Sequence, residues 1–170
     1  MYDTFSGRMF FDFSTPTPVT AMAFDPNGQL WVAGASAIHR FDPFDGVEKF
    51  PPIEPLELRQ PWGLAIGEDG NVYATSTDKE NDTHEILRFD LEGNPNGQSP
   101  SSPVFVPNAK NGGLNDPRDL VSVRVRSLPP TLYVASFAAT SGVQGVLEYD
   151  GDTGEFKRVL IRPPVEDLAG

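Results

Sequence analysis

The side chains in this sequence that could best ligate a metal ion lie in an acidic segment at residues 78–85. Asp78 and Asp82 supply carboxylate oxygens, the donors that a hard cation such as Ca²⁺ prefers. Their spacing does not match an EF-hand loop, and acidic loops are common in a chain with 13 Lys and Arg against 24 Asp and Glu. The segment therefore has two interpretations, a Ca²⁺ site at Asp78 and Asp82 or a solvated loop.

Catalytic side chains are hard to assign. His39 and His84 are the two histidines, and neither is tied to a serine or an aspartate by a recognisable catalytic spacing. The absence of cysteine excludes disulfides, thiolate metal sites and thiol nucleophiles. We assign no catalytic residue, expect no cofactor other than the possible Ca²⁺ ion, and favour a binding protein over an enzyme.

The net charge of −11 bears on partners, because it repels phosphate backbones and anionic headgroups. Nucleic acid is therefore not expected as a partner. No window approaches the ~20 apolar residues of a membrane span, so membrane insertion is not expected either. The first residues have no basic and apolar regions of a signal peptide, and the compartment stays open on this evidence.

A degenerate repeat organises the chain. An aromatic residue followed by Asp and a short polar turn occurs four times, at Tyr2-Asp3, Phe41-Asp42, Phe89-Asp90 and Tyr149-Asp150. The intervals lie near the ~40–50 residues of a four-stranded propeller blade, with insertions in the later copies. Each of the last three copies follows a predicted strand, turn and strand, with turns at Asn27-Gly28, Asp69-Gly70 and Pro129-Pro130.

These elements predict an all-β protein, a β-propeller of about three and a half four-stranded blades that belongs to a six- or seven-bladed ring. We expect one partial propeller over residues 1–170, with a half blade at 1–17 and blades at 18–59, 60–113 and 114–170. An arc of blades leaves an apolar sheet face bare at each end. Remaining blades or self-association must cover those faces, and we favour a piece of a longer chain over a head-to-tail dimer.

The predicted loops place a binding site on one face. The long segments 76–85, 93–116 and 136–145 are expected on the same side of the propeller, and long loops on a rigid scaffold often bind ligands. The candidate ligand-binding residues there are Trp62, Asn115, Arg118 and Asp119. Each also has a structural interpretation, as a residue packed between blades, a turn cap or an ion pair between neighbouring loops.

Two segments resemble the start of NHL-type repeat blades: residues 60–74, QPWGLAIGEDGNVYA, and residues 112–120, GGLNDPRDL. The resemblance extends over residues 18–160 and implies a propeller similar to bacterial extracytoplasmic ones, which favours an extracytoplasmic location. Distantly similar propellers include the senescence-marker-protein/gluconolactonase family, with a central divalent metal, and the streptogramin lyases, with a catalytic His. The strand starts here carry Val19, Trp62 and Arg118, so neither set of catalytic residues is matched.

Three functions remain open. The first is a non-catalytic binding or scaffold propeller that uses the loop-rich face for a protein or carbohydrate ligand. The second is a metal-dependent, lactonase-like hydrolase or a lyase whose essential residues lie in blades outside this sequence. The third is a self-assembling partial propeller with a structural role.

Overall fold

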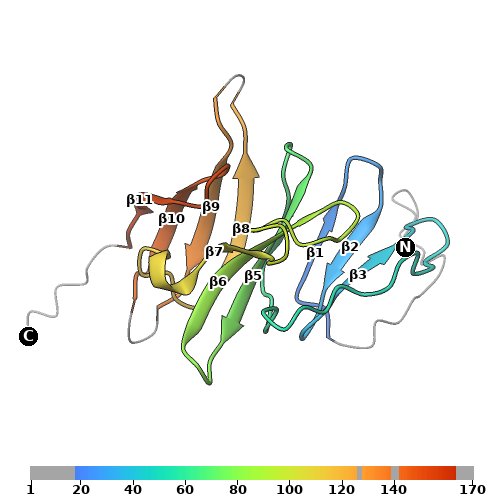
Figure 1. Cartoon of the computed structure of the whole chain (residues 1–170), viewed down its shortest axis with the longest axis horizontal. Helices are drawn as coiled ribbons and strands as arrows, with labels where there is room; N and C mark the ends of the chain where they lie inside the picture. The colour runs from blue at the N-terminus through green and yellow to red at the C-terminus, as the bar shows by residue number, and fades with distance from the viewer. Residues whose placement is uncertain (1–17, 126–127, 139–141, 164–170) are drawn as a thin grey trace, which may run out of the picture.

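The computed structural model of the chain describes residues 18–125, 128–138 and 142–163 (Figure 1). Its strands are β1 (Ala21–Phe24), β2 (Leu30–Ala33), β3 (Ile38–Phe41), β4 (Leu64–Ile66), β5 (Asn71–Asp78), β6 (Thr83–Asp90), β7 (Val104–Val106), β8 (Pro117–Val123), β9 (Thr131–Ser136), β10 (Gly145–Asp150) and β11 (Phe156–Ile161). One 3-10 turn, η1 (Asn108–Lys110), follows β7. Among these residues, no helix is long and apolar enough to cross a membrane.

The strands form three antiparallel sheets in which neighbours in sequence are neighbours in space. The first sheet is β1-β2-β3, the second β4-β5-β6-β7 and the third β8-β9-β10-β11. In the first sheet the predicted fourth strand is reduced to isolated bridges from Ile38 to Ile53 and from Phe41 to Glu48. The all-β, propeller-like architecture predicted from the repeat is confirmed, and the predicted half blade at 1–17 lies outside the described residues.

The three sheets stand side by side like the blades of a fan (Figure 1). The first strands of successive sheets lie closest together, because β1 contacts β4 and β4 contacts β8. The innermost strands therefore line one side of the array, as the predicted blade order requires.

Hairpin turns form where the sequence places Asp and Gly together. The carboxylate of Asp25 accepts the backbone N–H groups of Asn27 and Gln29, each at 2.9 Å, and Gly28 takes a positive φ of 82°. The turn at Asp69 repeats this chemistry, since its carboxylate accepts the N–H of Asn71 at 3.1 Å. These side chains fix the turn geometry that lets each first and second strand pair.

The core lies in two layers between the sheets. Trp31 and Ile38 of the first sheet pack against Val72 and Phe89 of the second, and all four side chains are buried. On the other side of the second sheet, Tyr73 packs with residues of the third sheet. The second sheet is thus covered on both faces, as a blade between two neighbours must be.

Side chains on the face of the third sheet that points away from the second sheet are less buried than the side chains between the sheets. Trp31 and Tyr73 are fully buried, as their equivalent second-strand positions predict. Tyr133 occupies the same position in β9 but is only half-buried, and Val121 of β8 is 50% exposed. The repeat position of Tyr133 predicts a blade-core residue, as for Trp31 and Tyr73, and this prediction is wrong for Tyr133 because no described blade covers that face.

An arginine links each sheet to the next. Arg40 pairs in register with Trp31, and its Nη1 donates to the Glu92 carbonyl of the second sheet at 2.7 Å. Arg88 pairs in register with Tyr73, and its Nη1 lies 3.4 Å from the carbonyl oxygens of Gly151 and Asp152 in the third sheet.

The third sheet has no arginine at this register position. Glu148 pairs with Tyr133 there and instead accepts a hydrogen bond from Arg158 of the same sheet at 2.8 Å. Among the three described sheets, this arginine is therefore present in the first two and absent from the third.

Two predicted loops are more ordered than their composition suggests. The segment 76–85 is mostly a hairpin, in which Ser76 pairs with Glu85 and Asp78 with Thr83. The Gly- and Pro-rich composition of segment 93–103 predicts a flexible crossing between blades, but the segment connects β6 to β7 within the second sheet. Hydrogen bonds between its own backbone groups, such as the Gly97 N–H to the Ser102 carbonyl at 2.9 Å, give it a fixed path.

Candidate functional site

The loop-rich face forms where the β5–β6 hairpin, the connection from β7 to β8 and the end of β9 meet. The Phe137 N–H donates to the Asn115 carbonyl at 3.0 Å, and the Asn115 N–H donates to the Ser136 hydroxyl at 3.0 Å. These bonds fix the residue before β8 against the residue that leaves β9. Polar side chains from two sheets are thereby brought to one place.

His84 is the centre of this arrangement and is only 6% exposed. Its N–H donates to the Asn108 side-chain oxygen at 3.0 Å, and its carbonyl accepts from the Asn111 amide at 2.9 Å. The Asp116 N–H donates to ring Nδ1 at 3.3 Å, a contact that suits the tautomer with its hydrogen on Nε2. Nε2 lies 3.3 Å from an Asp82 carboxylate oxygen, which accepts its hydrogen.

Arg118 lies beside this centre, between two aromatic rings. Its guanidinium carbon is 4.8 Å from the Trp62 ring centroid and 5.7 Å from that of Phe137. Nη2 donates to a carboxylate oxygen of Asp116. Trp62 precedes β4 in the second sheet and Phe137 follows β9 in the third, so the guanidinium stacks across a boundary between sheets.

Asp116 itself is held in an unusual backbone conformation, with φ at 42°. Its second carboxylate oxygen is buried and has no hydrogen-bond partner among the described residues, and the indole nitrogen of Trp62 is in the same situation. Buried polar atoms are normally hydrogen-bonded, because leaving one unpaired costs about 1–3 kcal/mol. Two such atoms thus flank the guanidinium of Arg118.

Three of the four predicted ligand-binding residues come together here. Trp62 contacts Arg118, and the Asn115 amide lies 3.2 Å from Nε2 of His84. Asp119 is exposed on β8, where its carboxylate accepts the N–H of Leu120 at 2.8 Å. It is adjacent in sequence to Arg118, but this hydrogen bond is to its own strand and not to the other three residues.

The two predicted metal ligands close the hairpin between β5 and β6. The Asp78 carboxylate accepts the N–H groups of Glu80 and Asn81 at 3.0 and 3.2 Å, and the Asn81 side-chain amide at 2.9 Å. Asp82, with φ at 49°, accepts from His84. Over the described part of the chain, no three acidic or histidine side chains lie close enough together to hold a metal ion.

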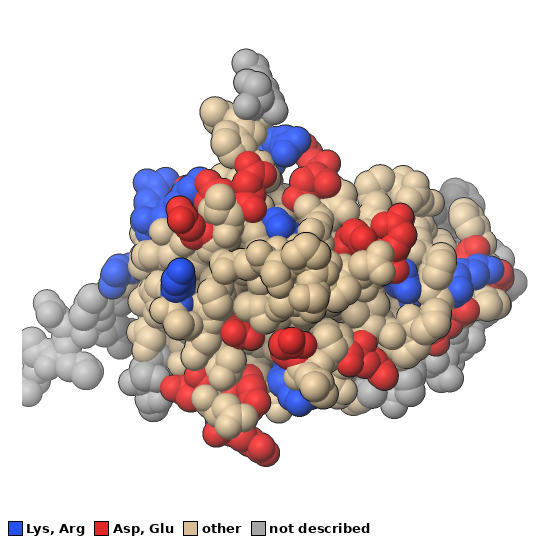
Figure 2. Space-filling model, in the orientation of Figure 1, with Lys and Arg blue, Asp and Glu red and all other residues tan. Residues whose placement is uncertain are grey.

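The pKa values of two carboxyl groups on this hairpin are shifted in opposite directions. The hydrogen bond from the Asn81 side chain, with help from backbone N–H groups, lowers the pKa of Asp78 below its ordinary value. Burial raises the pKa of Glu85, although the Asn108 N–H donates to that carboxyl at 3.2 Å. The acidic tip of the hairpin projects at the lower edge of Figure 2, while other acidic side chains are spread over the visible face.

We expect the His84→Phe variant to lose about 1–3 kcal/mol of stability, because the Asp116 N–H would lose its acceptor beside a buried ring. Urea denaturation followed by circular dichroism measures the change. The matched control is Asp82→Asn, which alters an exposed partner of the same ring and should have little effect. Equal stability of His84→Phe and the wild type would contradict the structural role of Nδ1.

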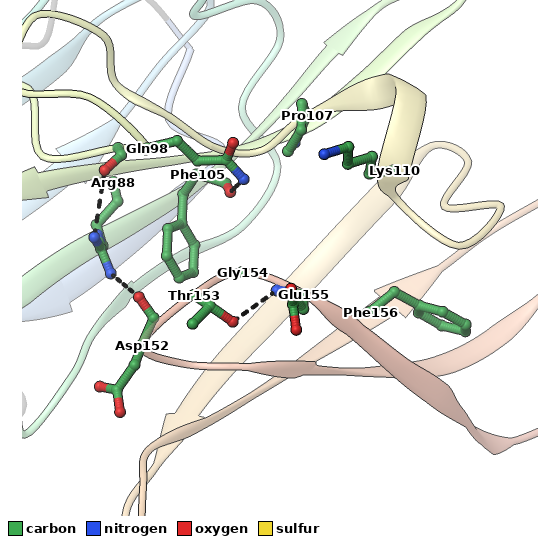
Figure 3. Close-up of a pocket in the computed structure, with 11 residues that line it drawn as sticks. Arg88, Gln98, Phe105, Pro107, Lys110, Asp152, Thr153, Gly154, Glu155 and Phe156 are labelled. Atoms are coloured by element: carbon green, nitrogen blue, oxygen red, sulfur yellow. Dashed lines mark hydrogen bonds between the residues drawn. The ribbon is translucent and has the colours of Figure 1, made fainter.

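A groove opens between the second and third sheets, on the side that carries the β6–β7 and β10–β11 connections (Figure 3). Its volume is about 700 Å³. One wall comes from Gln98, Phe105 and Lys110, and the other from Asp152, Thr153 and Glu155. The guanidinium carbon of Arg88 lies 4.0 Å from the Phe105 ring centroid and joins the two walls.

Sequence reasoning missed His84, Asp116, Phe137 and Arg88. His84 was considered only as a catalytic base, and nothing in its spacing indicates that it binds the β7–β8 connection. Arg88 had a usable signal, because Arg precedes Phe-Asp at both residues 40–42 and 88–90. In each case the register places that arginine beside the aromatic residue of the preceding strand.

Comparison with known proteins finds no matching family model and no matching curated protein. Solved structures do match. A protein of unknown function from Bacteroides caccae aligns at a TM-score of 0.57 and 11% identity, over 95% of this chain and 53% of that one. The extracellular domain of a candidate hybrid two component system from Bacteroides thetaiotaomicron aligns at 0.60 and 15%, over 98% of this chain and 19% of that one.

These identities show a shared fold and nothing finer. The chain spans about half the length of the first structure and about a fifth of the second. A virginiamycin B lyase from Staphylococcus aureus also aligns, at a TM-score of 0.40 and 14% identity over 88% of this chain and 59% of that one. The fold is that of a partial propeller. Assignment to the NHL class or to the gluconolactonase-like families is not shown by these comparisons.

Proposed function

We propose that this chain is a non-catalytic binding or scaffold propeller whose loop-rich face recognises a protein or carbohydrate ligand at Arg118. The observation that carries the proposal is the guanidinium of Arg118, stacked between Trp62 and Phe137 from different sheets and still 39% exposed. The Asp116 carboxylate accepts a hydrogen bond from Nη2 of this guanidinium. A guanidinium fixed in this way binds acceptors with little loss of conformational freedom.

Hydrogen-bond acceptors on the ligand suit this arrangement. Among the described residues, the Arg118 guanidinium donates a hydrogen bond from Nη2 to Asp116, and its remaining N–H groups can donate to a ligand. Sugar hydroxyl oxygens, carboxylates and peptide carbonyls all accept from such donors. We propose Trp62, Asn115, Arg118 and Asp119 as the ligand-binding set, with Asp119 at its edge.

The blades are proposed to be NHL-type, on the motifs at residues 60–74 and 112–120. We propose an extracytoplasmic location, which the fold shared with extracellular domains of candidate signalling proteins supports. A Ca²⁺ ion at Asp78 and Asp82 is left out, because both carboxylates already accept the hydrogen bonds that shape the hairpin. Further blades are the proposed cover for the half-buried free face of the third sheet.

The test screens the purified chain against an array of neutral and acidic oligosaccharides and against a displayed peptide library. For a selected ligand, calorimetry compares the wild type with Arg118→Ala and Trp62→Ala, and each variant should bind at least about tenfold more weakly. Arg158→Ala is the matched control, because Arg158 is 64% exposed on β11 and far from the stacked rings in the sheet order. Ligands that bind both variants as tightly as the wild type, or no ligand in either screen, would contradict recognition at this face.

A further inference from the structure

We propose a second ligand site, in the groove between the second and third sheets, for a small zwitterion such as a free amino acid or a short peptide. The groove uses none of the residues proposed for the loop-rich face. Its volume of about 700 Å³ falls within the ~300–1,000 Å³ typical of small-molecule sites. Figure 3 shows Lys110 on one side of it and Asp152 and Glu155 on the other.

The charges on the two walls are separated. Lys110 is exposed and has no ion-pair partner in the part of the chain that the structure describes. Asp152 and Glu155 are also exposed, and neither forms an ion pair with a described residue. Lys110 belongs to one wall of the groove and Asp152 and Glu155 belong to the other, so the unpaired charges leave room for a ligand that carries both an ammonium and a carboxylate. Its carboxylate would meet Lys110, and its ammonium would meet Asp152 and Glu155.

The acidic wall is held in place before any ligand arrives. The Asp150 carboxylate accepts the N–H groups of Asp152 and Thr153, each at 3.0 Å, and pairs with Lys157 at 3.1 Å. At Gly154, with φ at 75°, an added Cβ would lie 2.4 Å from the Phe105 carbonyl oxygen, so the turn sits directly against β7. A wall whose backbone is held in this way loses little conformational entropy when a ligand binds.

Neutral groups complete the groove between the charges. The Gln98 amide nitrogen donates to the Phe105 carbonyl at 3.1 Å, which leaves its side-chain oxygen free to accept from a ligand. The Thr153 hydroxyl oxygen accepts the Glu155 N–H at 3.3 Å, which leaves its O–H free to donate. A peptide bond, with one donor and one acceptor, matches these two groups.

The equivalent groove between the first and second sheets lacks this separation of charge. It is lined by Phe44, Lys49 and Glu92 among others and has a volume of about 470 Å³. Lys49 is already paired there, with Asp45 at 2.9 Å and with Asp42 at 3.5 Å. Each of the two boundaries between the described sheets therefore has a groove, and of these two the second carries an unpaired cation on one wall and unpaired carboxylates on the other.

The test is calorimetry of the purified chain with the dipeptide alanyl-phenylalanine and with its N-acetylated and C-amidated forms. The free dipeptide should bind, and each modification should weaken binding by about tenfold or more, because each removes one charged contact. Two variants test which wall binds which charge: Lys110→Gln, and the double variant Asp152→Asn/Glu155→Gln. Lys110→Gln should no longer distinguish the amidated form, and the double variant should no longer distinguish the acetylated form.

Arg118→Ala is the control that separates this proposal from the loop-rich face, and it should bind the dipeptide like the wild type. Circular dichroism establishes that every variant is folded. Absence of dipeptide binding, or equal binding of the free and modified forms, would overturn the zwitterion site. Dipeptide binding that Arg118→Ala abolishes would move the ligand to the loop-rich face and equally overturn this assignment.

Discussion

The Trp31→Ala variant is expected to be about 3–5 kcal/mol less stable than the wild type, the largest loss from any single substitution considered. Trp31 is fully buried in β2 and packs between the first two sheets. Its Nε1 donates to the Asp25 carboxylate at 3.2 Å, and the Arg40 guanidinium carbon lies 5.3 Å from its ring centroid. Removing the ring therefore leaves a cavity, an Asp25 carboxylate without this donor, and an Arg40 guanidinium that keeps its contact with the Phe50 ring.

Urea denaturation followed by circular dichroism measures this loss, because the substitution removes one of the two tryptophan fluorophores. Trp31→Phe is the matched control. It keeps most of the buried ring and removes the hydrogen bond to Asp25, so its loss should be about 1–2 kcal/mol. A loss below 1 kcal/mol for Trp31→Ala would show that the first sheet is not held by this layer of the core.

The Arg88→Ala variant is expected to lose about 3 kcal/mol of stability, since several hydrogen bonds from one charged group disappear together. The guanidinium donates to carbonyl oxygens of Asn96 and Gly97 in the second sheet and of Gly151 and Asp152 in the third. It also lies over the Phe105 ring. Its loss should loosen the boundary between the two sheets as well as the β6–β7 connection.

Two further variants make this result specific. Arg88→Lys keeps the charge but not the planar fork of donors, so it should recover only a small part of the stability. Arg158→Ala removes an exposed arginine that pairs with a single carboxylate, and it should change stability little. Hydrogen exchange of the Asp150–Gly154 turn should accelerate in Arg88→Ala, and unchanged exchange there would argue against a link between the sheets.

Local sequence signals predicted the fold well. Asn-Gly and Asp-Gly turns fix short hairpins through side-chain caps and positive φ angles, and the alternation of apolar residues fixes which side of each strand is buried. These are interactions over a few residues, so they can be read from the sequence. For that reason β3, β6 and β10 end at or beside the aromatic-Asp pairs of the repeat, at Phe41, Asp90 and Asp150.

The prediction failed where the composition of a segment did not decide its contacts. The segment 93–103 has the Gly, Pro and Ser content of a flexible linker, yet backbone pairing and the Asp90 cap on Asn94 order it within one sheet. Tyr133 has the sequence position of a core residue, yet its burial depends on a neighbouring sheet. Both outcomes depend on what lies alongside in space.

In the candidate site, too, some features follow from local sequence patterns and others only from packing between sheets. The sequence by itself determined that Trp62, Asn115 and Arg118 would stand at or near the first strands of neighbouring blades, because the repeat fixes their strand positions. Only the tertiary structure decided that Arg118 stacks between Trp62 and Phe137 and that His84 binds the Asp116 N–H. Residues so distant along the chain meet through the packing of one sheet on the next, and no local pattern encodes that contact.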